Sequence, residues 1–265
     1  MLSDNPINIP ILTELIPDGL KPGTLFLVEF DPESEWLAIA ATMTAGYLHG
    51  GGRAAYIAEL RSPDTVRENL FALGVDVSVM SKEGRFWMVD RYSATLTGGR
   101  LEGEGSSVFE PMDGGIRFRS LKLSDLSIQW LKEKKQGHEP WDVVDTWPPG
   151  ALAIGESISQ LLRFNEEKPY LEFIINRGHP NERKAKRIKL MGILRDVHTQ
   201  LFYRQLENDY DGVIDLRTME RDNKRKTFLR VRSLKGQAYD ARWHEVQIRR
   251  NGEAALAPYL PETDF

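Results

Sequence analysis

The sequence predicts an α/β fold with a mostly parallel central sheet and a β-rich C-terminal part. Short apolar runs alternate with helical patterns through the first two thirds of the chain, which is typical of strands joined by crossover helices. In the last third, strand patterns follow one another directly. No repeat or linker divides the 265 residues, so we expect one domain over residues 1–265.

The first elements alternate as a parallel sheet requires. Apolar runs at residues 24–28, 54–58 and 86–89 predict buried strands. Residues 36–48 predict a helix that is packed on several sides. This order implies right-handed crossovers that return each strand to the same sheet.

The helix after the second strand has signals at both ends. Ser62 is of the residue type preferred at an N-cap, and Pro63 suits the first helical position. Gly74 can end the helix in a left-handed conformation. We therefore expect a helix between Pro63 and Gly74.

A glycine-rich insertion at about residues 95–120 interrupts the alternation, and we expect a surface hairpin or a mobile loop there. Residues 123–135 then predict an amphipathic helix with a basic C-terminal end. Residues 151–154 predict a fourth strand, and residues 168–176 predict another helix.

The last third of the chain predicts the β-rich part. Residues 191–194, 212–216, 227–231 and 245–248 have strand patterns, and the last three follow in near-hairpin order. The tail, residues 254–265, is expected to be extended.

The composition is that of an ordinary globular protein and excludes several classes of function. The net charge is −4, from 35 basic and 39 acidic residues, so no overall field attracts nucleic acid or a membrane. The absence of cysteine excludes disulfides, thiolate catalysis and cysteine-ligated zinc. Residues 37–48 form an apolar stretch that is shorter than the roughly 20 residues needed to cross a bilayer. We expect a cytoplasmic protein.

The junction between the first strand and the next helix is the most informative segment. Nucleotide-binding proteins wrap glycines and a lysine around phosphates in this setting, whereas this junction has three acids and no glycine or lysine. An ordinary helix start is the local alternative, with Asp31 as N-cap and nearby acids stabilised by the helix dipole. The junction consists of Phe30, Asp31, Pro32, Glu33, Ser34, Glu35, Trp36 and Leu37.

The order of elements from about residue 16 to residue 252 resembles the RecA-like ATPases of the KaiC type, which have a P-loop NTPase fold. The resemblance implies a three-layer RecA-like fold. Residues 22–28 resemble the family's "pGtl.lv" strand, and residues 55–63 resemble its strand ending in "EE-S/T-P". Residues 73–76 and 83–90 resemble "lGwD…eGkl.ivD". Residues 211–216 resemble "aDgvi.L", and residues 229–236 resemble "lrv.KmRG".

The same resemblance assigns roles to the junction. Asp31 and Pro32 match the D-P of the family's G-D-P-G-T-G-K-T loop, while Trp36 stands where the phosphate-binding lysine is expected. Leu37 replaces the hydroxyl that meets Mg²⁺. The glycine positions, where side chains obstruct a close wrap around an anion, are occupied by Phe30, Glu33 and Glu35.

Other functional positions of the family also differ. Leu60 and Arg61 align with the paired glutamates that help to activate water, and Ser233 replaces the lysine of "KmRG". Glu156 stands for the magnesium-orienting aspartate of the Walker B strand. The resemblance therefore implies a pseudo-ATPase with degenerate Walker motifs, no catalytic residue, no bound cofactor and no metal.

We expect a non-catalytic structural or regulatory subunit of an oligomeric assembly, because relatives of this fold assemble side by side. The partner would be a second copy or a RecA-like paralogue. An ATP-binding protein or ATPase with an atypical loop is the alternative within the family. Catalysis by Asp90 and Glu156, which both end predicted parallel strands, is a further alternative.

Nucleic-acid binding is an alternative from a different class, because two segments are locally basic despite the acidic total. Ordinary solvated surfaces would explain the same pattern. Segments 183–189 and 221–235 contribute Arg183, Lys184, Lys186, Arg187, Lys189, Lys224, Arg225, Lys226, Arg232 and Lys235.

Overall fold

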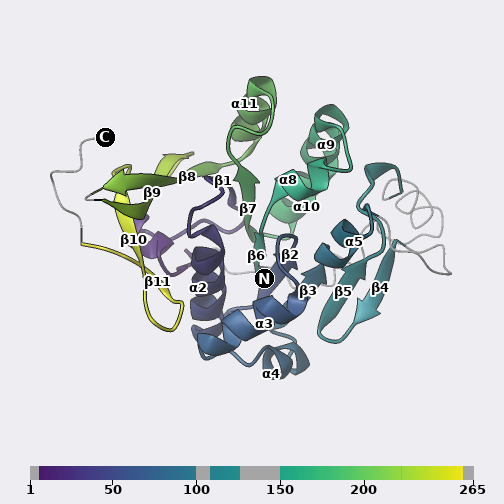
Figure 1. The fold of residues 1–265 in the computed structure, drawn as a ribbon, viewed down its shortest axis with the longest axis horizontal. Helices are drawn as coiled ribbons and strands as arrows, with labels where there is room; N and C mark the ends of the chain where they lie inside the picture. The colour runs from purple at the N-terminus through teal and green to yellow at the C-terminus, as the bar shows by residue number, and fades with distance from the viewer. Residues whose placement is uncertain (1–5, 100–107, 126–149, 222, 259–265) are drawn as a thin grey trace.

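The computed structural model describes residues 6–99, 108–125, 150–221 and 223–258, and within them the strands form one sheet of eleven (Figure 1). The order across the sheet is β11-β10-β9-β8-β1-β7-β6-β2-β3-β5-β4. The strands are β1 (Leu25–Phe30), β2 (Ala54–Ala58), β3 (Phe86–Asp90), β4 (Phe109–Met112), β5 (Gly115–Phe118), β6 (Leu152–Gly155), β7 (Ile188–Leu194), β8 (Gly212–Arg221), β9 (Lys224–Leu234), β10 (His244–Ile248) and β11 (Ala254–Leu256).

The predicted parallel centre is confirmed. β8, β1, β7, β6, β2, β3 and β5 run parallel, and β9, β10, β11 and β4 join antiparallel at the two sides. All six residues of β1 are buried, as expected for a strand covered on both faces. The predicted C-terminal hairpin order is also confirmed, because β8, β9 and β10 pair in succession.

Helices cover both faces of the sheet, so the fold has three layers (Figure 1). α2 (Trp36–His49), α3 (Pro63–Ala72) and α4 (Val77–Lys82) pack on one face together with the short α1 (Leu12–Leu15). The other face carries α5 (Tyr92–Leu96), α8 (Ile158–Leu162), α9 (Glu167–Phe173), a π-helix (Ile174–Gly178), α10 (His179–Lys184) and α11 (Gln200–Asp209).

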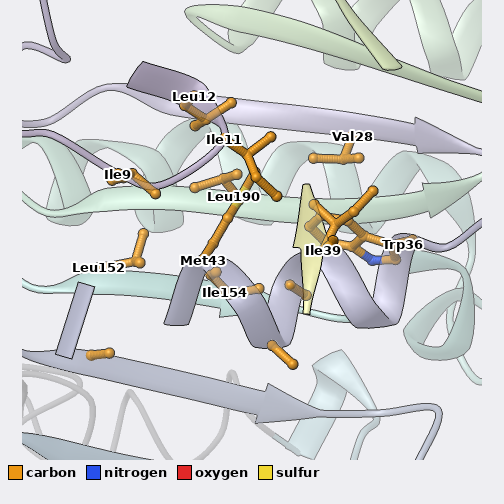
Figure 2. Packing of buried hydrophobic residues seen from close by; sticks show 14 of the residues in the cluster. Ile9, Ile11, Leu12, Val28, Trp36, Ile39, Met43, Leu152, Ile154 and Leu190 are labelled. Carbon is orange, nitrogen blue, oxygen red and sulfur yellow. The ribbon is translucent and has the colours of Figure 1, made fainter. Parts of the chain in front are cut away.

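α2 is the central helix of its layer. It matches the predicted helix closely and is buried on several sides, with Ile39 and Met43 in the apolar cluster beneath it (Figure 2). The C-terminal β11 docks against this helix, since the Ala254 N–H donates to the hydroxyl of Thr42 at 2.8 Å. The first residues of the predicted extended tail therefore belong to the sheet.

Both expected signals of α3 are confirmed. The Ser62 hydroxyl accepts a hydrogen bond from the Thr65 N–H at 3.2 Å, with Pro63 at the first position. Gly74 has a φ of +82°, in the left-handed region that a glycine adopts without strain.

Two segments go beyond the expectation, and two others are not tested. The insertion at 95–120 contains a hairpin, as one of the two expectations had it, but this hairpin, β4–β5, extends the central sheet because β5 pairs in parallel with β3. The helix expected at 168–176 begins at Glu167 and continues through the π-helix into α10. Most of the helix expected at 123–135 and the last part of the tail lie outside the described residues.

No helix in the described ranges combines the length and the apolar composition that crossing a bilayer requires.

Candidate functional site at the carboxyl edge of the sheet

The junction between β1 and α2 is a five-residue turn. β1 includes Phe30, which the sequence placed in the loop, because its backbone pairs with both Leu194 and Leu216. The chain then turns, with the Ser34 N–H donating to the Asp31 carbonyl at 2.9 Å, before α2 begins at Trp36.

The expectation that Asp31 caps α2 is wrong. The N-cap position is Glu35, whose side chain makes no capping bond, and Asp31 lies too far before the first turn. The Asp31 carboxylate instead accepts from the Thr218 N–H at 2.8 Å and pairs with Arg195 at 3.5 Å. Asp31 therefore ties the end of β1 to the segments of β8 and β7 beside it.

The Trp36 side chain is buried at the carboxyl ends of the central strands. It is 1% exposed, and its indole Nε1 donates to the Glu156 carbonyl at 2.8 Å. The ring belongs to the apolar cluster under α2 (Figure 2), with the Phe30 ring 6.3 Å away between centroids. A Cβ on Gly192 would lie 2.5 Å from this nitrogen, so any larger residue at this position would clash with the indole.

The two glutamates of the junction lie at the surface. Glu33 pairs with Arg225 at 2.8 Å, with both side chains more than half exposed, and Glu35 is exposed. Pro32 is exposed as well, and Leu37 is half-buried. The space at the centre of the junction is thus occupied by the indole of Trp36 and by neither carboxylate.

Glu156, which follows β6, is fully buried and fully hydrogen-bonded. Its carboxylate accepts from the N–H groups of Glu59, Leu60 and Arg61 at 2.8, 2.6 and 3.1 Å. The Tyr56 hydroxyl and the Arg61 Nε each donate at 3.0 Å. Five donors use the roughly four acceptor sites of a carboxylate, so none is left over for a metal-bound water.

Three buried acids lie at this edge, each with its own arginine. Glu156 pairs with Arg61 at 3.0 Å and Asp90 with Arg117 at 2.7 Å. Glu59, just after β2, pairs with Arg91 at 2.8 Å. The parallel neighbours β3, β2 and β6 bring the three acids together, so each negative charge is compensated locally.

Glu59 is the member of this group that the sequence analysis missed. The sequence pattern that could have identified Glu59 is an acid directly after a predicted strand. Glu59 follows the strand at 54–58 in the same way that Asp90 and Glu156 follow the strands at 86–89 and 151–154. Burial raises the pKa of Glu59, with Arg91 and the Ser157 N–H opposing the rise.

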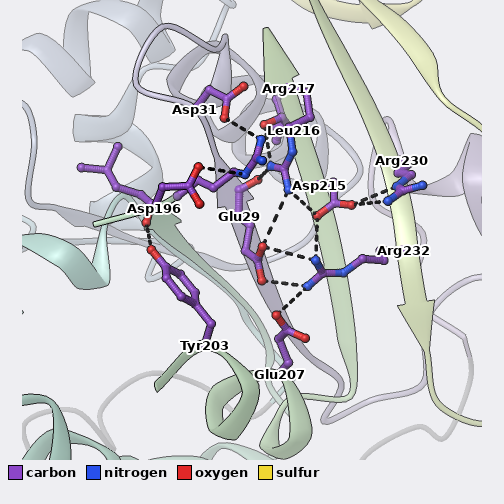
Figure 3. Close-up of polar contacts among 12 residues, drawn as sticks. Glu29, Asp31, Asp196, Tyr203, Glu207, Asp215, Leu216, Arg217, Arg230 and Arg232 are labelled. Atoms are coloured by element: carbon purple, nitrogen blue, oxygen red, sulfur yellow. Dashed lines mark hydrogen bonds and ion pairs between the residues drawn. The ribbon is translucent and has the colours of Figure 1, made fainter. Parts of the chain in front are cut away.

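A second charged cluster lies on the neighbouring strands β1, β8 and β9 (Figure 3). Arg232 contacts Glu29 at 2.8 Å and Glu207 of α11 at 2.9 Å. Asp215 pairs with Arg230 and Arg217 at 2.9 and 3.1 Å. Burial raises the pKa of Glu29 from its ordinary 4.5 to about 7, with Arg232 opposing the rise and Glu207 adding to it.

The basic residues proposed to contact nucleic acid do not form one surface. Segment 183–189 leads into the amino end of β7, whereas the tip between β8 and β9 extends beyond the carboxyl ends of the parallel strands. The β8–β9 tip therefore lies at the opposite edge of the sheet from segment 183–189. β9 runs back to the amino edge, however, where the Lys235 N–H donates to the Asp211 carbonyl at 2.8 Å and Arg183 pairs with the Asp211 carboxylate.

Most of these basic side chains also have partners. Arg187 and Lys189 pair with Glu182 at 3.3 and 3.1 Å, and Arg183 pairs with Asp211 at 3.4 Å. Lys226 pairs with Glu245 at 2.8 Å, while the Lys235 ammonium donates to two main-chain carbonyls. Lys184 and Lys224 are exposed.

Within the described ranges, no three histidine or acidic side chains gather in a way that could hold a metal ion. Three of the histidines have acidic partners instead, since His179 contacts Asp209, His198 contacts Glu167 and His244 contacts Asp240.

Comparison with known proteins identifies the fold. No protein-family model and no curated protein matches the chain. Among solved structures, a KaiC-like protein from the hyperthermophilic archaeon Pyrococcus horikoshii OT3 matches with a TM-score of 0.63. The match has 14% sequence identity and covers 97% of this chain and 98% of that chain. The chain therefore has a KaiC-like RecA fold.

The close approach at Gly192 gives a test of the packing around Trp36. Gly192→Ala is expected to lower the free energy of unfolding by about 1–3 kcal/mol, because the added methyl group would meet the Glu156 carbonyl and the indole. Urea unfolding measures the change. Gly50→Ala is the matched control, since its Cβ would make only ordinary contacts at a φ of −69°. Equal effects of the two substitutions would contradict the packing described here.

The raised pKa of Glu29 gives a pH dependence. Between about pH 4.5 and 7 the folded state holds a proton on Glu29 that the unfolded state has lost. The stability contributed by this group is thus complete below pH 4.5 and is lost as the pH rises to about 7. Glu29→Gln should remove this loss, so the difference in unfolding free energy between wild type and variant should vary with pH across this window. A constant difference would contradict the raised pKa.

Proposed function

We propose that this protein is a non-catalytic member of the RecA-like group that has lost the phosphate-binding loop and acts as a structural or regulatory subunit of an oligomeric assembly. The observation that carries the proposal is the buried indole of Trp36, bonded to the Glu156 carbonyl at the junction of β1 and α2. In the resemblance to KaiC-type ATPases, this residue stands where a lysine would meet the phosphates.

A phosphate-binding loop needs free backbone N–H groups around an open space and a nearby positive charge. The uncharged side chain of Trp36 takes up this space and packs against Gly192 and Phe30. Opening the site would expose an indole that belongs to the apolar core, at a cost of about 1.5–3 kcal/mol or more.

The acids at the carboxyl edge support the same conclusion. A magnesium-dependent ATPase needs a carboxylate with acceptor sites turned toward the metal and its water shell. The Glu156 carboxylate is instead held by five donors, three of them main-chain N–H groups of the turn that contains Leu60 and Arg61. Arg61 compensates the charge that a metal would otherwise balance.

The oligomeric part of the proposal rests on the fold. The KaiC-like architecture is one in which subunits assemble side by side. A chain that neither binds nor hydrolyses nucleotide would still serve as a structural subunit of such an assembly. Nucleic-acid binding has less support, because the basic residues of the β8–β9 tip lie at the opposite edge of the sheet from segment 183–189 and most charges of the two segments are paired.

Nucleotide binding is the direct test. Titration of the purified chain with millimolar Mg·ATP in a calorimeter is expected to give no binding isotherm, and ATP hydrolysis should stay at the level of buffer. A P-loop ATPase titrated under the same conditions serves as the control. A clear isotherm for this chain would overturn the proposal, because the junction would then have to open around the phosphates.

Assembly is tested independently of nucleotide. Light scattering across a range of protein concentrations is expected to give a mass above that of the 30.2 kDa chain. A strict monomer at high concentration would exclude the homo-oligomeric form of the proposal. Co-purification with a RecA-like paralogue would then decide the hetero-oligomeric form.

A further inference from the structure

A cavity lies on the face of the sheet opposite α2, beneath α9, the π-helix and α10. Its walls are mainly apolar and include Leu121, Leu161, Phe173, Ile174 and Met191. The centre of a water-sized sphere can occupy about 90 Å³ of it, whereas roughly 10–15 Å³ is enough for one water molecule. The cavity can therefore hold a ligand of several non-hydrogen atoms.

The cavity is separate from the junction that contains Trp36. Successive residues of a strand point to opposite faces, so Leu190 of β7 lies in the core under α2 while Met191 lines the cavity. The sheet itself separates the two places.

The charged side chains of the cavity wall already have partners of opposite charge. Arg91 pairs with Glu59 at 2.8 Å. The buried Glu182 pairs with Arg187 at 3.3 Å and with Lys189 at 3.1 Å. A ligand with a net charge would lose its water shell and meet only charges that are compensated, which is costly. The wall therefore favours a neutral ligand.

One polar group of the wall lacks a partner. The Tyr210 side chain is 1% exposed, and among the described residues its hydroxyl makes no hydrogen bond. The ring is held nearly perpendicular to the ring of His179, with 4.5 Å between the centroids. Burial raises the pKa of Tyr210 well above its ordinary value, so the hydroxyl stays neutral and can donate or accept.

Buried hydroxyl groups without a hydrogen bond are uncommon in folded proteins, because the group has lost its water and gained nothing in return. A hydroxyl of this kind in the wall of a cavity indicates that a polar atom of a ligand completes the site. The Tyr210 hydroxyl is therefore the position at which the polar group of a ligand is expected.

The local helix geometry supports a binding role. The π-helix contributes Ile174 and Gly178 to the wall, between α9 and α10. Such π-helical turns are rare and are frequently found at functional sites. The half-buried Asn181 of α10 also lines the cavity, and its amide is able to donate and to accept.

We propose that this cavity binds a small neutral molecule with an apolar body and one hydroxyl or carbonyl group. The polar group would form a hydrogen bond with the Tyr210 hydroxyl, while the apolar body would pack on Leu161, Ile174 and Met191. Apolar walls with a few well-placed polar groups are the usual composition of a small-molecule site.

The test is calorimetric titration of the full chain with phenol and with toluene, which has the same shape but a methyl group in place of the hydroxyl. We expect an isotherm with one site for phenol, because phenol supplies both the apolar body and the polar group. Absence of phenol binding would mean that the cavity holds only water, and it would overturn the proposal.

Tyr210→Phe tests the hydrogen bond. The substitution removes only an unpaired buried hydroxyl, so the free protein should be as stable as the wild type or more stable. Phenol affinity should fall about tenfold, while toluene affinity should stay the same. Tyr92→Phe, outside the cavity wall, is the matched control and should change neither affinity. Unchanged phenol affinity, or an equal loss for both probes, would overturn the assignment to Tyr210.

Ile174→Phe tests the location independently of the hydrogen bond. The larger side chain would fill part of the cavity, so phenol and toluene should both bind at least about tenfold more weakly. The matched control is Ile175→Phe, because Ile175 is 39% exposed and does not line the cavity. Wild-type affinity for phenol in a folded Ile174→Phe protein would overturn the proposal. Neither position touches the junction at Trp36, so the outcome does not depend on the nucleotide test.

Discussion

The hydrogen bond from the Trp36 indole to the Glu156 carbonyl joins the elements that meet at the carboxyl edge of the sheet. Through its carbonyl, Glu156 anchors the start of α2, and through its carboxylate it holds the turn after β2 by three main-chain N–H groups. One buried residue thereby positions both the start of α2 and the turn after β2. The indole can lie there only because Gly192 leaves β7 without a side chain at the point of contact.

At the carboxyl edge of the sheet, each buried acid is compensated by a neighbouring arginine. Glu59, Asp90 and Glu156 are buried at three neighbouring strand ends, and a separate arginine pairs with each. The cluster around Glu29 and Asp215 follows the same rule with three arginines (Figure 3).

Much of the architecture was predictable from local pattern. The apolar runs of β1, β2 and β3 and the helix at α2 were found because their burial on both faces leaves continuous apolar stretches in the sequence. The predictions failed where partners far apart in the chain decide the outcome. Asp31 looked like an N-cap, yet its carboxylate bonds to Thr218, which lies 187 residues away. A hairpin was among the expectations for the insertion at 95–120, but its place in the central sheet was not, because that place depends on the pairing of β5 with β3.

The sequence by itself determined the fold class, the order along the chain of the central strands β1, β2, β3, β6, β7 and β8, and the identity of the residue at each position of the junction. It also showed that the junction lacks glycine and lysine, because composition is a local property. Only the tertiary structure decided where those side chains lie: that Trp36 is buried while Glu33 and Glu35 are exposed, that Glu59 joins Asp90 and Glu156, and that the β8–β9 tip lies at the opposite edge of the sheet from segment 183–189. The physical reason is that burial and charge pairing are set by strands that neighbour one another in space and are distant in sequence.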